Sequence, residues 1–191
     1  GDWSSDVCSS DLKPDRKPGS FEVTWGIPTS IFLQIHVALS LIGILTGLVT
    51  VLGMIGGRYL GGWTAIFLAT TLLTGVTGFP LAPFGLDPPR IVGAILLCLL
   101  IAAGAGLYLF ALRGAWCSVY VICAVAALYL NVFVAIAQSF QKITILHALA
   151  PTQSEPPFAV AQVAGLVLFG VLGFLAWRRF PSSGATIASL T

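Results

Sequence analysis

Apolar residues run in five long blocks along this chain, and charged or helix-breaking residues separate the blocks. A helix needs about 20 consecutive apolar residues to cross roughly 30 Å of hydrocarbon, because each residue advances it by about 1.5 Å. Five blocks meet this requirement: residues 30–55, 63–83, 91–112, 115–139 and 158–177. The pattern therefore predicts an all-α membrane protein in which residues 30–180 form a bundle of five transmembrane helices.

The segments outside these blocks are more polar. Residues 1–12 resemble translated sequencing-adapter sequence, so we expect them to be non-native; residues 13–29 predict an exposed lead-in, and residues 181–191 a short tail. Within 140–157, Ile143, Leu146 and Leu149 recur at helical spacing and predict a short interfacial helix before the last span. We consider two roles for it, a lid over the polar ends of the spans or a plain connector.

The composition supports a membrane protein and excludes several other classes. Hydrophobic residues make up 57% of the chain and charged residues 8%, against roughly 25% charged residues in an average soluble domain. The mean hydropathy is +0.97. A disordered chain would be more polar, and a protein that binds nucleic acid through a basic stripe would carry more lysine and arginine. We expect the lipid bilayer as partner and no nucleic acid.

The few charges divide unequally between the two membrane faces. Five spans place the termini on opposite faces, and the loops on the C-terminal side hold four arginines and no acidic residue: Arg58, Arg113, Arg178 and Arg179. All seven acidic residues lie on the other face with five basic ones. Cytoplasmic loops are enriched in lysine and arginine, so we expect the C-terminus in the cytoplasm.

Small and polar residues form stripes along several spans. In the first span, residues spaced three or four apart share one helical face: His36, Ser40, Gly43, Gly47 and Thr50. Such stripes are typical of helix packing in lipid, where small residues allow close approach and polar side chains turn toward protein. Packing alone is one interpretation of them.

A second interpretation is a ligand cavity, because the polar groups gather toward one leaflet. His36 lies near the start of the first span, Asn131 and Gln138 lie in the second half of the fourth, Gln162 begins the fifth, and His147 lies in the loop on the same face. A through-channel would need polar groups at both ends. We therefore predict a cavity open to the outer leaflet, with these five residues as hydrogen-bonding groups that bind a small or lipidic ligand or a partner subunit.

The sequence offers little catalytic chemistry. It contains no nucleophile elbow, HExxH motif, P-loop or dinucleotide-binding fingerprint, so we expect no catalytic residue, no metal and no cofactor. An ionisable group such as His36 within a span is a functional candidate. One alternative is a b-type haem redox protein with His36 and His147 as axial ligands. Another is an accessory subunit whose polar seams assemble a membrane complex or a homo-oligomer.

Several polar stretches resemble one family of small multi-pass bacterial inner-membrane proteins, uncharacterised and without an established activity. They are Ala127–Val134, Gln138–Lys142, His147–Phe158, Leu73–Phe79 and Arg178–Phe180. The resemblance implies a bacterial inner-membrane location and a multi-pass topology, and it implies no functional residue.

Overall fold

The computed structural model describes residues 23–24, 26–81 and 88–180. Our predictions for residues 1–12 and 181–191 lie outside these ranges, as does most of the predicted lead-in. The helices are α1 (Thr29–Ile55), α2 (Gly61–Gly78), α3 (Pro88–Gly104), α4 (Ala115–Lys142), α5 (Thr144–Leu149) and α6 (Pro156–Arg179). Two short helical segments extend α2 and α3: the 3₁₀ turn η1 (Phe79–Leu81) and the π-helical η2 (Ala105–Leu109).

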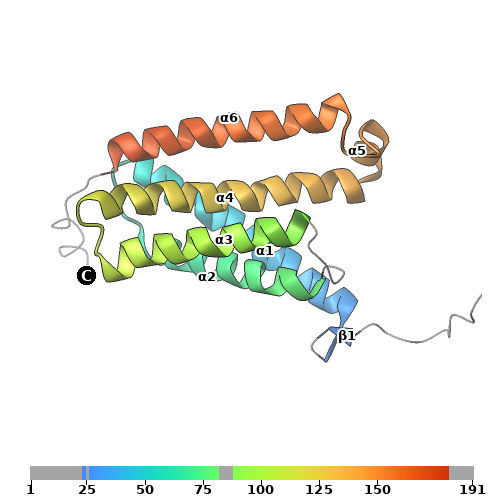
Figure 1. The fold of residues 1–191 in the computed structure, drawn as a ribbon, viewed down its shortest axis with the longest axis horizontal. Helices are drawn as coiled ribbons and strands as arrows, with labels where there is room; N and C mark the ends of the chain where they lie inside the picture. Colours follow the sequence, from blue (N-terminus) through green and yellow to red (C-terminus); the bar gives the residue numbers. More distant parts are fainter. Residues whose placement is uncertain (1–22, 25, 82–87, 181–191) are drawn as a thin grey trace, which may run out of the picture.

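The structure confirms the predicted fold class. Five helices are long and apolar enough to cross a membrane, and the short α5 lies between α4 and α6, as predicted before the last span (Figure 1). Ahead of α1, two-residue strands β1 (Val23–Thr24) and β2 (Ile27–Pro28) form an antiparallel pair. We did not predict this pair, because two residues carry no readable alternation.

The second span ends earlier than its hydropathy indicates. We predicted a helix to residue 83, but α2 ends at Gly78 and η1 continues it as one tighter turn. Pro80 explains this end, because proline has no N–H to donate to the carbonyl four residues before it, although Phe79 itself keeps helical dihedral angles. The apolar character of the segment continues past the residue where its helical hydrogen bonding stops.

The third span also departs from the predicted continuous helix over 91–112. Its last turn is π-helical, and the chain then reverses with positive φ at Ala111, Leu112 and Gly114. The rings of Phe110 and Trp116 stack across this reversal, with centroids 3.8 Å apart and planes 3° from parallel. The predicted loop between the third and fourth spans is very short. The last residues that we assigned to the third span from their hydropathy therefore form the turn.

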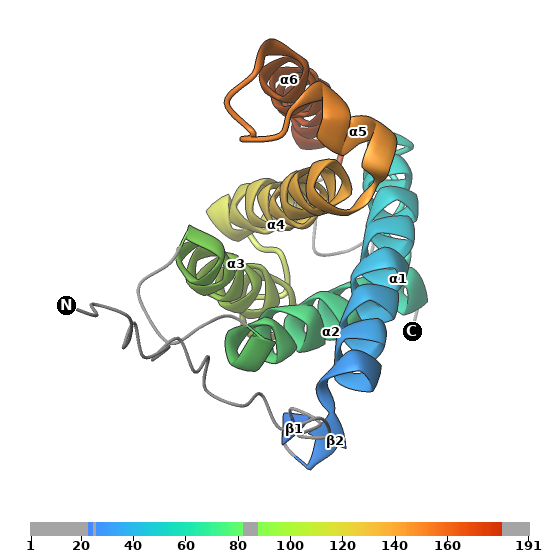
Figure 2. The same cartoon turned by 90° about the vertical axis from the view of Figure 1, so that its right-hand side faces the viewer.

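The helices form a bundle with α1 and α4 at its centre. Helix α1 packs against α2, α4 and α6, and α4 packs against α3, α5 and α6. In the view along the bundle, α1, α2, α3 and α4 surround a common interior, and α6 lies on the far side of α4 from α3 (Figure 2). Helix α6 is the least buried span, and much of its apolar surface faces outward.

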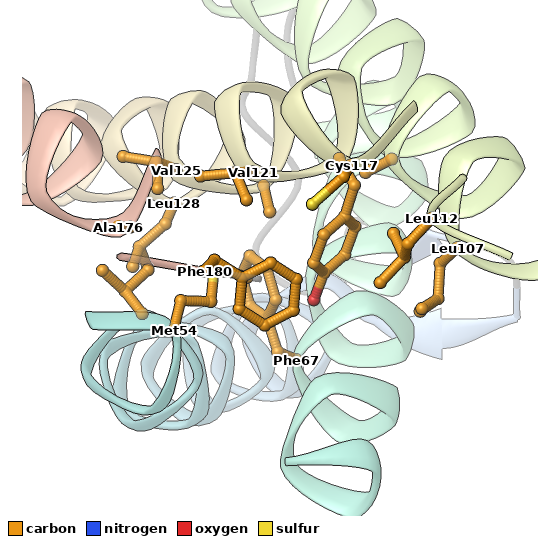
Figure 3. Close-up of a cluster of buried hydrophobic side chains, with 14 of the residues drawn as sticks. Met54, Phe67, Leu107, Leu112, Cys117, Val121, Val125, Leu128, Ala176 and Phe180 are labelled. Carbon is orange, nitrogen blue, oxygen red and sulfur yellow. The ribbon is translucent and has the colours of Figure 1, made fainter. Parts of the chain in front are cut away.

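One end of the bundle holds a continuous apolar core. We call it the arginine end, because Arg58, Arg113, Arg178 and Arg179 follow or precede the helix termini there. Val121 and Leu128 of α4 pack here with Met54 of α1 and Phe67 of α2 (Figure 3). All four side chains are at most 1% exposed. This end is filled by interlocking side chains.

Gly47 allows α1 to approach its neighbours at the edge of this core. A Cβ atom placed there would lie 2.7 Å from Leu128 Cδ1 and 2.8 Å from Phe67 Cδ2. Both neighbours are buried and cannot withdraw easily, so the close contact of α1 with α2 and α4 requires glycine at this position.

Candidate ligand-binding cavity

The other end of the bundle contains a cavity of about 570 Å³. We call it the cavity end; α1, α3 and α6 begin there, and α2 and α4 end there. The cavity lies among α1, α2 with η1, α3 and α4, and its surface is largely apolar. Its larger apolar side chains include Leu33, Val37, Leu41, Leu96, Leu130 and Val134. Ligand cavities in proteins typically measure 300–1,000 Å³ and combine apolar walls with a few polar groups.

His36 lies on the α1 wall of the cavity, as its position on the polar stripe predicted. Its Nδ1 lies 2.9 Å from Thr77 Oγ1, and Thr77 Oγ1 donates to the Leu73 carbonyl at 2.7 Å. When Thr77 Oγ1 gives its one proton to this carbonyl, its contact with His36 requires the ring proton to be on Nδ1. This bond ties α1 to α2 and holds the ring beside Gly78, where an added Cβ would lie 3.5 Å from His36 Cε1.

Asn131 joins α1 to α4 deeper in the cavity. Ser40 Oγ donates to Asn131 Oδ1 at 2.7 Å, and Asn131 Nδ2 donates to the Ser40 carbonyl at 3.4 Å. Gly43 makes this approach possible, since a Cβ there would lie 2.9 Å from Thr71 Oγ1 and 3.3 Å from Asn131 Nδ2. Asn131 is therefore a structural bridge as well as a lining residue.

Gln138 lies one helical turn from Lys142, and both side chains line the cavity from α4. Neither side chain makes a hydrogen bond within the described ranges. Arg90 of α3 also lines the cavity, and its Nη2 donates to the Phe79 carbonyl at 3.3 Å. The side-chain amide of Gln138 and the Lys142 ammonium are thus free to bind a ligand.

Sequence reasoning missed both cations as cavity residues, because it counted them only as loop charges. Lys142 could have been found: Asn131, Ala135, Gln138 and Lys142 follow one another at spacings of four, three and four, which places them on one helical face. The predicted end of the fourth span at residue 139 excluded it, whereas α4 continues to Lys142. Arg90 carried no such signal, because its position depends on how α3 packs.

The structure places the remaining two candidates away from the cavity. Gln162 is buried between α6 and α4, where its Nε2 donates to the Phe133 carbonyl at 3.2 Å. His147 is exposed on α5. The structure therefore brings His36, Asn131 and Gln138 together, and it leaves Gln162 in a helix contact and His147 on the surface.

Helix α5 is a connector held against α4. None of its residues lines the cavity, so the lid that we considered for this segment is not formed. The loop after it is fixed by Gln153, whose Nε2 donates to the Ala137 carbonyl at 2.7 Å and whose Oε1 accepts from Gln141 Nε2 at 3.2 Å. These bonds hold Gln153 at a positive φ of 60°.

No family model, no curated protein and no solved structure matches this chain. The cavity must therefore be interpreted from its own chemistry. Within residues 23–24, 26–81 and 88–180, no group of three or more histidine, cysteine or acidic side chains is arranged to hold a metal ion. Since His147 does not line the cavity that contains His36, no observation favours the two-histidine haem site. What the lining offers is hydrogen bonding and positive charge beside an apolar interior.

Proposed function

We propose that this protein is a non-catalytic membrane protein that binds an amphipathic ligand from the bilayer in the cavity at the cavity end of the bundle. The observation that carries the proposal is the combination of about 570 Å³ of largely apolar space with the side chains of Gln138 and Lys142 at one end, which are unpaired among the residues that the structure describes. An amphiphile matches this division, because its chain prefers apolar walls and its head group needs hydrogen-bonding partners.

The lining argues for a ligand rather than for helix packing alone. Where packing is the whole purpose, apolar side chains fill the interior, as they do at the arginine end. At the cavity end, Leu33, Val37 and Leu41 line open space instead. Lipid-like molecules fit such a surface.

A cavity-filling substitution tests this proposal. Ala135 lines the cavity on α4, whereas Ala164 lies on the outward apolar face of α6, in a separate shallow hollow. We expect the wild type and Ala164→Phe, purified in mild detergent, to retain a bilayer-derived ligand that native mass spectrometry detects. Ala135→Phe should lose most of it while unfolding at nearly the same temperature. Equal retention by both variants would contradict the proposal.

We place the protein in the bacterial inner membrane with its C-terminus in the cytoplasm, so that the cavity end lies in the outer leaflet. The four arginines at the arginine end support this orientation, and the family resemblance supports the bacterial location. Reporter fusions at the C-terminus check it: a fused green fluorescent protein should fluoresce, and a fused alkaline phosphatase should be inactive. The opposite pattern would reverse the orientation without removing the cavity.

The alternative is that a partner subunit or a second copy of the chain, and not an amphiphile, binds at the cavity end. Light scattering of the purified protein distinguishes the two cases, since a monomer that retains an amphiphile supports the ligand. An obligate complex in which cross-links from Gln138 reach another polypeptide would support an accessory-subunit role instead.

A further inference from the structure

The cavity carries positive charge at the end where the polar groups are unpaired. Arg90 and Lys142 both line it, and no aspartate or glutamate belongs to its described lining. Lys142 makes no ion pair within the described ranges, where Glu155 is the sole acidic residue. Lys142 is exposed at the end of α4, and the apolar walls beside it strengthen its attraction for an anion relative to a cation in bulk water.

The hydrogen-bond donors that remain free in the described lining are concentrated at the same place. Elsewhere in the cavity the hydroxyl groups are occupied by their own helices: Thr74 Oγ1 donates to the Thr70 carbonyl at 2.9 Å, and Ser139 Oγ to the Ala135 carbonyl at 2.8 Å. Asn131 is paired with Ser40. The free donors available to a head group are therefore those of Gln138 and Lys142. An ammonium group binds anionic acceptors more strongly than neutral ones.

The size and depth of the cavity limit the ligand. Its volume of about 570 Å³ lies in the range of small-molecule ligand cavities in proteins. Lys142 and Leu130 are twelve residues apart on α4 and both line the cavity, which corresponds to a depth of about 18 Å at 1.5 Å per residue. One extended hydrocarbon chain of about this length can lie along α4 between these two residues.

We propose that the ligand is a single-chain amphiphile with an anionic head group, a carboxylate or a phosphate. Its head group is bound by Gln138 and Lys142 near the end of α4. Its chain extends along Val134 and Leu130 toward Leu96. This inference rests on the proposed function and adds the charge and the chain number of the ligand.

Binding of three probes that share one chain tests the inference: palmitate, hexadecyl phosphate and hexadecanol. They are measured by equilibrium binding to the full-length protein in a nonionic detergent, at alkaline pH so that both acids are ionised. We expect at least one anion to bind about tenfold more tightly than the alcohol, and preference between the two anions identifies the head group. Equal binding of all three probes would overturn the inference.

Variants at Lys142 identify the group responsible. Lys142→Gln should weaken binding of the preferred anion about five- to tenfold and leave hexadecanol unchanged, whereas Lys142→Arg should retain the anion. Arg113→Gln at the arginine end is the matched control and should change neither. An anion preference that Lys142→Gln leaves intact would also overturn the inference.

The cavity-filling variant separates this inference from the proposed function. Ala135→Phe could abolish binding of all three probes while Lys142→Gln weakens none of them selectively. The cavity would then bind amphiphiles without distinguishing their charge, and only the further inference would fail. If Ala135→Phe leaves every probe bound, the probes bind outside the cavity and the proposed function itself fails.

Discussion

The two ends of the bundle differ in how completely side chains fill the space between the same helices. At the arginine end, Met54, Phe67 and Leu128 interlock with at most 1% of their surfaces exposed. At the cavity end, the same α1, α2 and α4 line about 570 Å³ of space. Since lipid gives no hydrophobic force between helices, the close packing at one end supplies the stability that allows the other end to stay open.

The polar groups around the cavity also differ from one another in their role. Those on the boundary between the two ends, such as Ser40 and Asn131, are satisfied by each other and fix how α1 meets α4. Those near the mouth of the cavity, Gln138 and Lys142, have no partner within the described ranges. Polar residues in one bundle thus divide into a structural set and a set available for binding.

The largest expected contrast comes from shortening a leucine at each end. Leu128→Ala removes a fully buried side chain from the packed core and should cost about 2 kcal/mol, the low end for such changes because the exposed reference is lipid rather than water. Leu130→Ala, on the same helix, changes a half-buried side chain that lines the cavity and packs against Leu96 and Leu100, and it should cost about 1 kcal/mol. Unfolding in mixed detergent micelles measures both, and similar losses would contradict the proposed difference in packing.

Adding a methyl group tests the same comparison in the opposite direction. Gly47→Ala places Cβ within 3 Å of Leu128 and Phe67 and should destabilise the protein by about 1–2 kcal/mol, as overpacking does. Gly170→Ala on α6, where an added Cβ meets no atom within 4 Å, should be neutral or slightly stabilising. Thermal unfolding in detergent measures both, and a neutral Gly47→Ala would show that α1 does not approach its neighbours so closely.

The Ser40–Asn131 bridge should contribute less than either packing effect. Interhelical hydrogen bonds in membranes average about 0.6 kcal/mol, so a double-mutant cycle of Ser40→Ala and Asn131→Ala should give a coupling energy near that value. The Thr70→Ala and Asn131→Ala pair is the control, because Thr70 Oγ1 donates within its own helix at 2.7 Å. If the effects of Ser40→Ala and Asn131→Ala were additive, the hydrogen bonds between these residues would not contribute to stability.

The smallest expected effect lies outside the membrane, in the loop before α6. Glu155 accepts from Thr152 Oγ1 at 2.9 Å and from the Ser154 N–H at 3.1 Å. Desolvation raises the pKa of this carboxyl, but hydrogen bonds from its own N–H, from Thr152 and from Ser154 together bring the pKa below its usual value.

These bonds stabilise the loop above the unfolded pKa of about 4.3 and are lost as the pH falls through the lower folded pKa. The amide resonances of Thr152 and Ser154 should therefore titrate below that unfolded value in the wild type. They should not do so in Glu155→Gln. Titration at or above the ordinary glutamate pKa would contradict the hydrogen bonding.

Sequence pattern predicted the parts of this fold that depend on local chemistry. The five spans follow from apolar length alone, and the stripe containing Gly43, Gly47 and Thr50 is buried as its spacing predicted. The ends of the spans were harder, because hydropathy does not register where Pro80 interrupts hydrogen bonding or where Leu112 is needed to turn the chain.

The candidate site was predictable only where one helix face determines it. His36, Asn131 and Gln138 lie in the cavity because their helices present the stripes inward. The location of Gln162 depends on how α6 packs against α4. Whether Arg90 lines the cavity depends on the position of α3. Neither contact is encoded in the spacing of residues along one helix.

Photo-crosslinking of a palmitate analogue with a diazirine along its chain tests the central claim most directly, since it reports where the chain lies in the folded protein. We predict adducts on cavity-lining residues such as Val37, Leu96 and Val134, and their loss in Ala135→Phe. Adducts confined to the outward face of α6, at residues such as Val160 and Val167, would show that the protein is only surrounded by amphiphiles and binds none in its interior.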